Sequence, residues 1–295
     1  MANPMPVAEV DISDDLVRCL LTEQHADLAD RAVRFESEGW DCAIFRLGDD
    51  LAVRLPRRAI NAALMPDELK WLPKLAPQLT LAVNAPVRAG APGCGYPWPW
   101  AVTAWFDGSS WADAPVDDPM LAAETLGKFV RSLATAAPED APTNPYRGGP
   151  LSDRDSAVRE RVQQLGASID AASVLHIWSD AVAAPKNASR RWLHGDLHPA
   201  NVIVRHGRLV AVIDWVDMCG GDWAYDLAAA WICFGDAAAR AAFKRAAGVQ
   251  DESAWRRARG CALSHGIACL ANSADNPRMH AEGEATLAAV LTDVA

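Results

Sequence analysis

The chain has 295 residues, 51% of them hydrophobic, and carries a formal net charge of −10 with an isoelectric point near 5.1. This length allows one large domain or two modest ones, with enough apolar residues for a sizeable core. The acidic balance argues against nucleic acid and an anionic membrane as main partners and suits a cationic ligand, while no apolar run approaches the length of a membrane span.

Seven cysteines are spread along the chain without a C-x-x-C pair, and most of them lie in apolar segments. This pattern predicts reduced, buried thiols, and it predicts neither a disulfide framework nor a zinc site. The N-terminal stretch MANPMPVAEVDISDD is acidic and has no apolar h-region, so no signal peptide is expected. We therefore expect a cytoplasmic protein.

The N-terminal third predicts a helix followed by a small antiparallel sheet. Ser13 is the expected N-cap of a helix with one apolar face. Strands are expected to begin at 33–35 and to cover 42–47 and 51–55, joined by tight turns. The first of these turns, residues 36–41, has a single glycine, so it does not predict a glycine-rich loop around phosphate groups.

Two charged residues in this part can each be interpreted in two ways. Alternation along the third strand puts Arg54 on the face opposite Val53 and Leu55, where it either points into a cleft or lies on the surface. Arginine is always charged and can bind phosphate through two hydrogen bonds, so a phosphate-binding role is workable. Glu68 lies in the first turn of the next helix, where it either pairs with Arg54 or simply suits the helix dipole.

Two further strands are expected at 86–89 and near 100–106, separated by a loop rich in proline and glycine. The chain then becomes helical, starting at Asp118-Pro119 and continuing to the alanine-rich C-terminal part. One loop, 137–152, interrupts the helices. Within it, Arg147-Gly148-Gly149-Pro150 is either a ligand-contacting turn or a simple linker.

The strongest chemical signal lies in residues 192–227, WLHGDLHPANVIVRHGRLVAVIDWVDMCGGDWAYDL. A polar loop there leads into an apolar hairpin, and Asp214 ends the return strand. If the turn centres on His206-Gly207, Asn201 faces Val212, and Asp214 lies two residues further, roughly 7 Å along the strand. Both polar side chains can then reach one point at the same end of the hairpin.

The types of these residues suggest phosphoryl transfer. An amide oxygen from Asn201 and a carboxylate from Asp214 are hard oxygen ligands suited to Mg²⁺. Asp196 lies five residues before Asn201, in the loop that leads into the first strand. This spacing fits an aspartate that accepts a proton from an incoming hydroxyl, while the other two residues hold metal on a nucleotide's phosphates.

The polar loop has two alternative interpretations. Aspartate and asparagine are common in turns because they bond their own backbone, so the loop could be only a solvated turn. Alternatively, His194, Asp196 and His198 could form a zinc triad for a hydrolase, because imidazole suits Zn²⁺ better than Mg²⁺. The triad requires an extended loop, and no further H-x-H or H-x-x-x-H cluster supplies a third imidazole.

HGDLHPAN followed by VIDW resembles the catalytic core of the aminoglycoside phosphotransferase family, within the protein-kinase-like superfamily. The family pattern is roughly H-G-D-x-x-x-x-N, then I-D-[FW]. The later GDWAYDLA resembles the family's G-D-P-x-x-D-L-A, with tryptophan in place of the usual proline. The resemblance covers the whole chain loosely, and only residues 192–228 carry high specificity.

The resemblance implies a role for each polar residue of the loop. Asp196 is implied to be the catalytic base, His194 to orient the loop, and Asp226 to brace the loop from the next helix. Asn201 and Asp214 are implied to be ligands of Mg²⁺ and, through the metal, part of the nucleotide site.

The resemblance also implies a nucleotide site in the N-terminal part. Arg54 takes the place of the lysine that grips the phosphates in kinases and shares in catalysis, with Glu68 as its partner. Residues 103–107 form the hinge between lobes, and the backbone from Ala104 to Phe106 bonds the adenine edge. The co-substrate is ATP or GTP, between which the sequence does not decide.

The implied fold is α+β and two-lobed, as in protein kinases. A small β-rich lobe, 1–105, lies on the side of the nucleotide phosphates, and a larger, mainly helical lobe, 106–295, carries the catalytic loop and the acceptor site. Acids that could meet the acceptor are Asp217, Asp222, Asp236 and Glu252, among which the sequence does not choose.

The implied reaction moves the γ-phosphate to a hydroxyl of an antibiotic such as an aminoglycoside, a macrolide or a basic peptide, and so inactivates it. Three alternative functions stay open. They are a metabolic kinase with a choline-like or sugar-like acceptor, a non-catalytic nucleotide-binding pseudo-kinase, and the His/Asp metal hydrolase.

Overall fold

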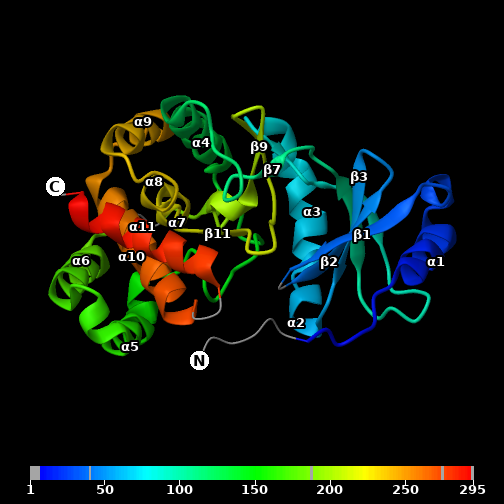
Figure 1. The fold of residues 1–295 in the computed structure, drawn as a ribbon, viewed down its shortest axis with the longest axis horizontal. Coiled ribbons are helices and arrows are strands. Elements are labelled where there is room, and N and C mark those ends of the chain that lie inside the picture. Colours follow the sequence, from blue (N-terminus) through cyan, green and yellow to red (C-terminus); the bar gives the residue numbers. More distant parts are fainter. Residues whose placement is uncertain (1–6, 40, 187–188, 274–275, 294–295) are drawn as a thin grey trace. The chain divides into compact units, whose positions relative to one another are not determined.

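The computed structural model describes residues 7–39, 41–186, 189–273 and 276–293. The chain forms two compact units (Figure 1). The smaller unit holds the described residues up to Gly108 together with Ala211–Val216. The larger unit holds Ser109–Val210 and the described residues from Asp217 onward. A sheet dominates the smaller unit and helices dominate the larger one, which confirms the predicted α+β class.

The smaller unit is built on a five-stranded antiparallel sheet with the order β1-β2-β3-β6-β5. Its strands are β1 (Val33–Glu38), β2 (Cys42–Leu47), β3 (Leu51–Pro56), β5 (Pro86–Gly90) and β6 (Trp100–Ala104). The prediction placed a turn from residue 36, but β1 continues to Glu38. A bulge between Phe35 and Ser37 takes up the irregular register, which lets the polar residues stay paired with β2.

A helix packs on each face of this sheet, because side chains alternate between the faces along each strand. Helix α1 (Asp14–Gln24) begins at the predicted cap, where the Ser13 hydroxyl oxygen accepts the N–H of Leu16 at 3.3 Å. Its apolar face joins one core, which includes Val17, Leu20, Leu21, Phe45, Val53, Leu55 and Trp100. On the other face, Met65 of α3 (Met65–Leu75) packs with Cys42 and Ala101.

The smaller unit contains a disulfide between Cys19 of α1 and Cys94 of the loop between β5 and β6. The prediction that all cysteines are reduced is therefore wrong for this pair. The two residues are 75 positions apart, and only the packing of α1 beside the loop brings their Cα atoms to 6.2 Å. Spacing along the sequence cannot show such a contact. The other five cysteines are free thiols.

The larger unit is mainly helical, and its long helix α10 (Glu252–Asn272) is buried along most of its length. Helix α11 (Pro277–Thr292) lies along α10, and Gly266 and Gly283 allow the close approach, since a Cβ on Gly283 would lie 2.9 Å from the carbonyl oxygen of Gly266. The other helices are α4 (Pro119–Leu133), α5 (Asp155–Leu165), α6 (Ala171–Ala183), α7 (Ala224–Leu227), α8 (Ala229–Ile232) and α9 (Ala237–Ala247).

Short strands hold the polar loop in this unit. Strand β8 (Arg191–Leu193) leads into the loop and pairs with β11 (Cys219–Gly221). Strand β9 (Val202–Arg205) follows the loop and forms a hairpin with β10 (Arg208–Val212). His206 and Gly207 have φ values of 50° and 64°, as a two-residue type I′ turn requires. The predicted hairpin and its turn are confirmed.

Two shorter pairings complete the strands. The outer strand β7 (Ser109–Ser110) pairs with β9 in the larger unit. In the smaller unit, the last residues of β10, Ala211 and Val212, pair in parallel with β4 (Ala82–Val83). Within the described part of the chain, no helix is both long enough and apolar enough to cross a membrane.

The contact between α4 and α9, which lie side by side (Figure 1), should be sensitive to a single methyl group. Alanine is normally about 1 kcal/mol better than glycine inside a helix. At Gly127, however, a Cβ would lie 2.6 Å from the carbonyl oxygen of Phe243 and 2.8 Å from the Cβ of Ala246. The steric overlap with the backbone should outweigh the better helix propensity of alanine. Gly127→Ala is therefore expected to lower the free energy of unfolding by about 1–3 kcal/mol.

Urea denaturation would measure this change, with Gly235→Ala as the matched control. A Cβ on Gly235 would meet no atom within 4 Å, so this variant should stay within about 0.5 kcal/mol of wild type. Wild-type stability in Gly127→Ala would show that the two helices do not approach so closely.

Candidate active site

The loop between β8 and β9 presents the carboxylate of Asp196 to two cationic side chains. Arg147 donates from Nη2 to Oδ1 at 2.8 Å, and Nε2 of His198 lies 3.5 Å from Oδ2. Burial alone would raise the pKa of Asp196, but the contacts with His198 and Arg147 hold it well below its usual range. Asp196 is therefore a charged base at neutral pH.

The backbone of this loop is fixed from two sides. The carboxylate of Asp226 in α7 accepts the N–H groups of His194 and Gly195 at 2.8 and 2.9 Å. The buried ring of His194 accepts the N–H of Asp196 through Nδ1 at 3.2 Å. Asn201 donates from its amide nitrogen to the carbonyl oxygen of Asp196 at 2.9 Å. His194 and Asp226 thus hold the loop, as the sequence implied.

Glycine is required at position 195, where the chain turns toward Asp196. Its φ is +86°, a region that favours glycine, and a Cβ there would lie 2.6 Å from the carbonyl oxygen of Asp217. The loop and the segment after β10 can approach this closely only because no side chain intervenes.

Arg147 is the residue of this site that sequence reasoning did not assign. It bridges two acids, because the same Nη2 atom also lies 3.0 Å from Oδ2 of Asp217, and Asn144 donates to that carboxylate at 2.7 Å. Burial would lower the pKa of Arg147, but the charges of Asp196 and Asp217 raise it. These contacts exclude a simple linker for the Arg147-Gly148-Gly149-Pro150 turn. The sequence feature that could have pointed to Arg147 is an arginine followed by two glycines in a proline-rich loop.

The structure distinguishes the four acidic residues that the sequence suggested for binding the acceptor. Asp217 and Asp196 both pair with Arg147. Asp222 is buried and paired with Arg257 at 2.6 Å, and Asp236 caps α9 by accepting the N–H of Ala239. Glu252 is exposed in the first turn of α10. Of the four acids, only Asp217 has a contact that links it to Asp196, while Asp222 and Asp236 stabilise the fold.

A chain of ionisable groups continues from Asp196 to the C-terminal helices. Nδ1 of His198 lies 3.5 Å from Oε2 of Glu282 in α11, and Oε1 of Glu282 lies 2.6 Å from Nε2 of His265 in α10. Burial would lower the pKa of His198, but Asp196 and Glu282 raise it to about 10. The two histidines in turn lower the pKa of Glu282 to about 2, against the effect of burial.

A second group of predicted residues lies in the smaller unit. Arg54 of β3 forms an ion pair with Glu68 of α3, and the two residues are only 4% and 1% exposed. This confirms the predicted contact and excludes a surface position for Arg54. Burial would lower the pKa of Arg54, but the negative charges of Glu68 and Asp214 raise it.

Asp214 follows β10 and has an unusual backbone conformation. Its φ of 65° lies in the left-handed region, which residues other than glycine adopt rarely and which is common at functional sites. Its charge acts on Arg54 and on the buried thiol of Cys42. The smaller unit thus groups Arg54, Glu68 and Asp214.

The predicted hinge begins where β6 ends. The backbone N–H of Trp105 donates to the carbonyl oxygen of Asp50 at 2.8 Å, and the guanidinium of Arg46 lies 4.2 Å from the centre of the Trp105 ring. Because Trp105 is held by these contacts, its N–H is not available to a ligand. The binding of adenine by the backbone of Ala104 and Phe106 stays a prediction.

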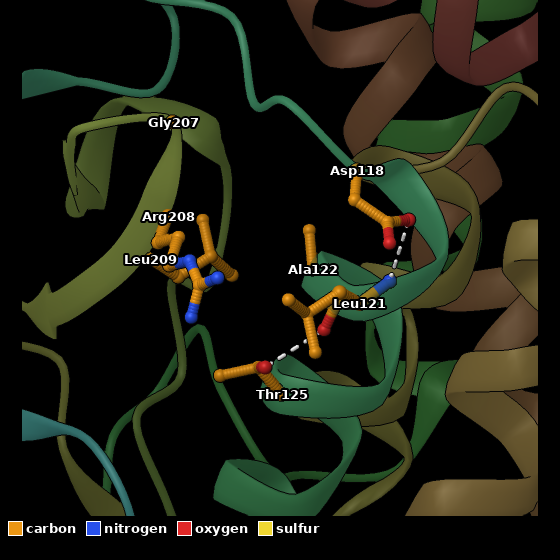
Figure 2. Close-up of a pocket in the computed structure, with 7 residues that line it drawn as sticks. All are labelled: Asp118, Leu121, Ala122, Thr125, Gly207, Arg208 and Leu209. Carbon is orange, nitrogen blue, oxygen red and sulfur yellow. Dashed lines mark hydrogen bonds between the residues drawn. The ribbon is translucent and has the colours of Figure 1, made fainter.

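A hollow of about 190 Å³ in the larger unit contains none of the predicted residues (Figure 2). It lies between the first turns of α4 and the hairpin turn at Gly207. Its polar groups serve the helix, since Asp118 accepts the N–H groups of Met120 and Leu121, and Thr125 donates to the carbonyl oxygen of Leu121. We assign no chemistry to this hollow.

The stability contributed by His198 should fall as the pH rises. Histidine has a pKa of about 6.5 in an unfolded chain, and here the folded value is raised to about 10. The contacts of its charged ring are therefore complete below about pH 6.5 and lost toward pH 10. Asp196 and Glu282 have lowered pKa values and stay ionised throughout this window.

The measurement is urea denaturation of wild type and His198→Gln in metal-free buffer from pH 6 to pH 9. The stability difference should be about 1.5–3 kcal/mol at pH 6 and shrink as the pH rises. His176→Gln, at an exposed site in α6, serves as the matched control. A difference that stays constant across the range would show that the charged imidazole is not what stabilises the fold.

Comparisons with known proteins identify the family of the chain. Residues 32–261 match the model of the APH family, described as the phosphotransferase enzyme family. No curated protein matches significantly. Among solved structures, the GDP and kanamycin complex of APH(2")-IIia has a TM-score of 0.67 at 19% identity, covering 91% of this chain and 95% of that chain.

Two other solved structures give the same result. Macrolide 2'-phosphotransferase MphH from Brachybacterium faecium has a TM-score of 0.60 at 23% identity, covering 96% of this chain and 98% of its own. ADP-bound APH(2'')-Ib has a TM-score of 0.60 at 16% identity, covering 94% and 98%. These likenesses confirm the predicted kinase-like fold. The chain therefore belongs to the phosphotransferase enzyme family, and it is a phosphotransferase with an alcohol group as acceptor.

Proposed function

We propose that the protein transfers the γ-phosphoryl group of ATP or GTP to a hydroxyl of a cationic antibiotic and so inactivates it. The observation that carries the proposal is the carboxylate of Asp196, which stays ionised between Arg147 and His198 on a rigid loop. A nucleotide co-substrate is supported by the similar proteins solved with GDP and with ADP.

In the proposed reaction, Asp196 orients the acceptor hydroxyl and takes its proton as the new oxygen–phosphorus bond forms and the bond between the γ-phosphorus and the departing nucleoside diphosphate breaks. This contributes roughly 10²–10⁴-fold to the rate. Arg147 holds the carboxylate in place through Oδ1, while His194, Asn201 and Asp226 fix the backbone that carries it. The residues of the loop therefore act mainly by positioning.

Asn201 and Asp214 have the donor set that a magnesium ion requires. The amide nitrogen of Asn201 donates to Asp196, so its amide oxygen is the atom left to serve as a ligand. Asp214 offers a carboxylate from a strained backbone position. Both are hard oxygen donors. When bound, Mg²⁺ would neutralise charge on the nucleotide's phosphates.

We assign the remaining nucleotide contacts to the N-terminal lobe, proposed to span 1–105. Arg54 would hold the phosphates, with Glu68 fixing its direction, because a buried and permanently charged guanidinium suits an anionic ligand. The backbone at Ala104 and Phe106 would bond adenine. The lobe 106–295 would supply the acceptor site.

A cationic acceptor is favoured by the charge of the protein. The chain carries a net −10, and Asp217 adds a carboxylate beside Asp196. Similar proteins have been solved with kanamycin, gentamicin and streptomycin. A metabolic kinase for a choline-like acceptor uses the same chemistry and is separated from the antibiotic kinase only by assaying both acceptors.

Asp196→Asn should bind nucleotide as the wild type does but lose turnover by roughly 10²–10⁴-fold. The amide keeps the shape of the carboxylate but cannot accept the hydroxyl proton. Phosphate mass gain on a panel of aminoglycosides and macrolides would measure turnover. Asp153→Asn, an exposed acid in the same unit, is the matched control and should keep full activity. Full activity in Asp196→Asn would remove the base assignment.

Asp214→Ala should weaken the Mg²⁺-dependent part of nucleotide binding, because it removes the proposed metal-binding carboxylate. Calorimetric titration of ATP and of GTP, each with and without Mg²⁺, would measure this and identify the preferred nucleotide. Asp15→Ala removes one charge from the same unit at a side chain that is 96% exposed, and should bind as wild type does. Identical magnesium dependence in Asp214→Ala would overturn the assignment of this ligand.

A further inference from the structure

A cluster of potential metal ligands outside the predicted residues lies where α10 and α11 meet. His265 and Cys269 are four residues apart on α10, so they lie on the same face of the helix. Glu282 faces them from α11, which the Gly266–Gly283 contact brings close. One ligand atom from each of the three residues lies within 4.8 Å of the other two.

The distances fit a tetrahedral zinc ion. With Zn–S bonds of about 2.3 Å and Zn–N bonds of about 2.0–2.1 Å, the two ligand atoms should be about 3.5 Å apart. Sγ of Cys269 lies 3.5 Å from Nε2 of His265. Oε1 of Glu282 lies 2.6 Å from the same nitrogen, so its carboxylate has to move less than about 1 Å to join them.

A fourth ligand can come from the catalytic loop if the ring of His198 shifts, because its nitrogens do not lie within 4.8 Å of all three of these ligand atoms. Nδ1 of His198 is buried without a hydrogen bond of good geometry and lies 3.5 Å from Oε2 of Glu282. The other ring nitrogen, Nε2, faces the carboxylate of Asp196. Zinc-bound histidines commonly donate their second N–H to a carboxylate, which fixes the ring and its tautomer. His198 has such a carboxylate in place.

We propose that His265, Cys269 and Glu282 form a zinc site between α10 and α11, and that Nδ1 of His198 completes it from the catalytic loop once its ring shifts toward the ion. The set of imidazole, thiolate and carboxylate ligands suits Zn²⁺ and does not suit Mg²⁺. Binding releases the thiol proton of Cys269, and any proton on Nδ1 of His198, to solvent. The ion uses neither of the proposed magnesium ligands, and it orients His198 toward Asp196.

The test is a Co²⁺ titration of chelator-treated protein in the presence of excess Mg²⁺. Co²⁺ takes the place of Zn²⁺ and reports a bound thiolate by charge-transfer absorption in the near ultraviolet. We expect one Co²⁺ per chain with this absorption, and its stoichiometric displacement by Zn²⁺. Zn²⁺ should also raise the melting temperature, because the site exists only in the folded protein.

Variants locate the ion. Cys269→Ser should abolish the charge-transfer absorption, and Glu282→Gln should weaken Co²⁺ binding by about tenfold or more. The matched control is Cys261→Ser, which removes another buried thiol of α10 and should keep the wild-type spectrum. No charge-transfer absorption at one equivalent of Co²⁺, or its survival in folded Cys269→Ser, would overturn the proposal. These readouts do not depend on phosphoryl transfer, so their failure leaves the proposed function untouched.

Discussion

The arrangement of the larger unit depends on keeping the half-buried carboxylate of Asp196 charged. Burial would favour the neutral form of Asp196, and two cations from different parts of the chain reverse this preference. Arg147 comes from a loop of prolines and glycines, and His198 comes from the catalytic loop itself. Gly195 lets these segments approach, and Asp226 holds the backbone that carries the carboxylate. The contacts that hold the loop in its conformation therefore include those that keep Asp196 charged.

The smaller unit holds a buried positive charge, where the larger unit holds a negative one. Its guanidinium, on Arg54, is buried beside the carboxylate of Glu68. Burying such a pair often brings little net stability, because the cost of desolvation offsets the attraction. Removing either partner would leave the other charge buried and uncompensated. The pair instead fixes the direction of a permanent positive charge on a rigid strand, which is what an anionic ligand requires.

The catalytic loop is also tied electrostatically to the C-terminal helices. Through His198, the carboxylate of Asp196 is linked to Glu282, and through Glu282 to His265. Changes in α10 or α11 can therefore alter the electrostatic environment of Asp196 without changing a residue of the loop. The close packing of these helices at Gly266 and Gly283 makes this link possible.

The sequence alone determined the family, the hairpin and the positions of the catalytic loop, because these depend on local spacing and on residue types. It also predicted the pairing of Arg54 with Glu68. It could not show the disulfide of Cys19 with Cys94, the place of Arg147 beside Asp196, or the meeting of His198 with Glu282. Each of these joins residues far apart in the chain. Only tertiary packing decides such contacts, because they depend on how closely helices and loops approach, which local patterns do not encode.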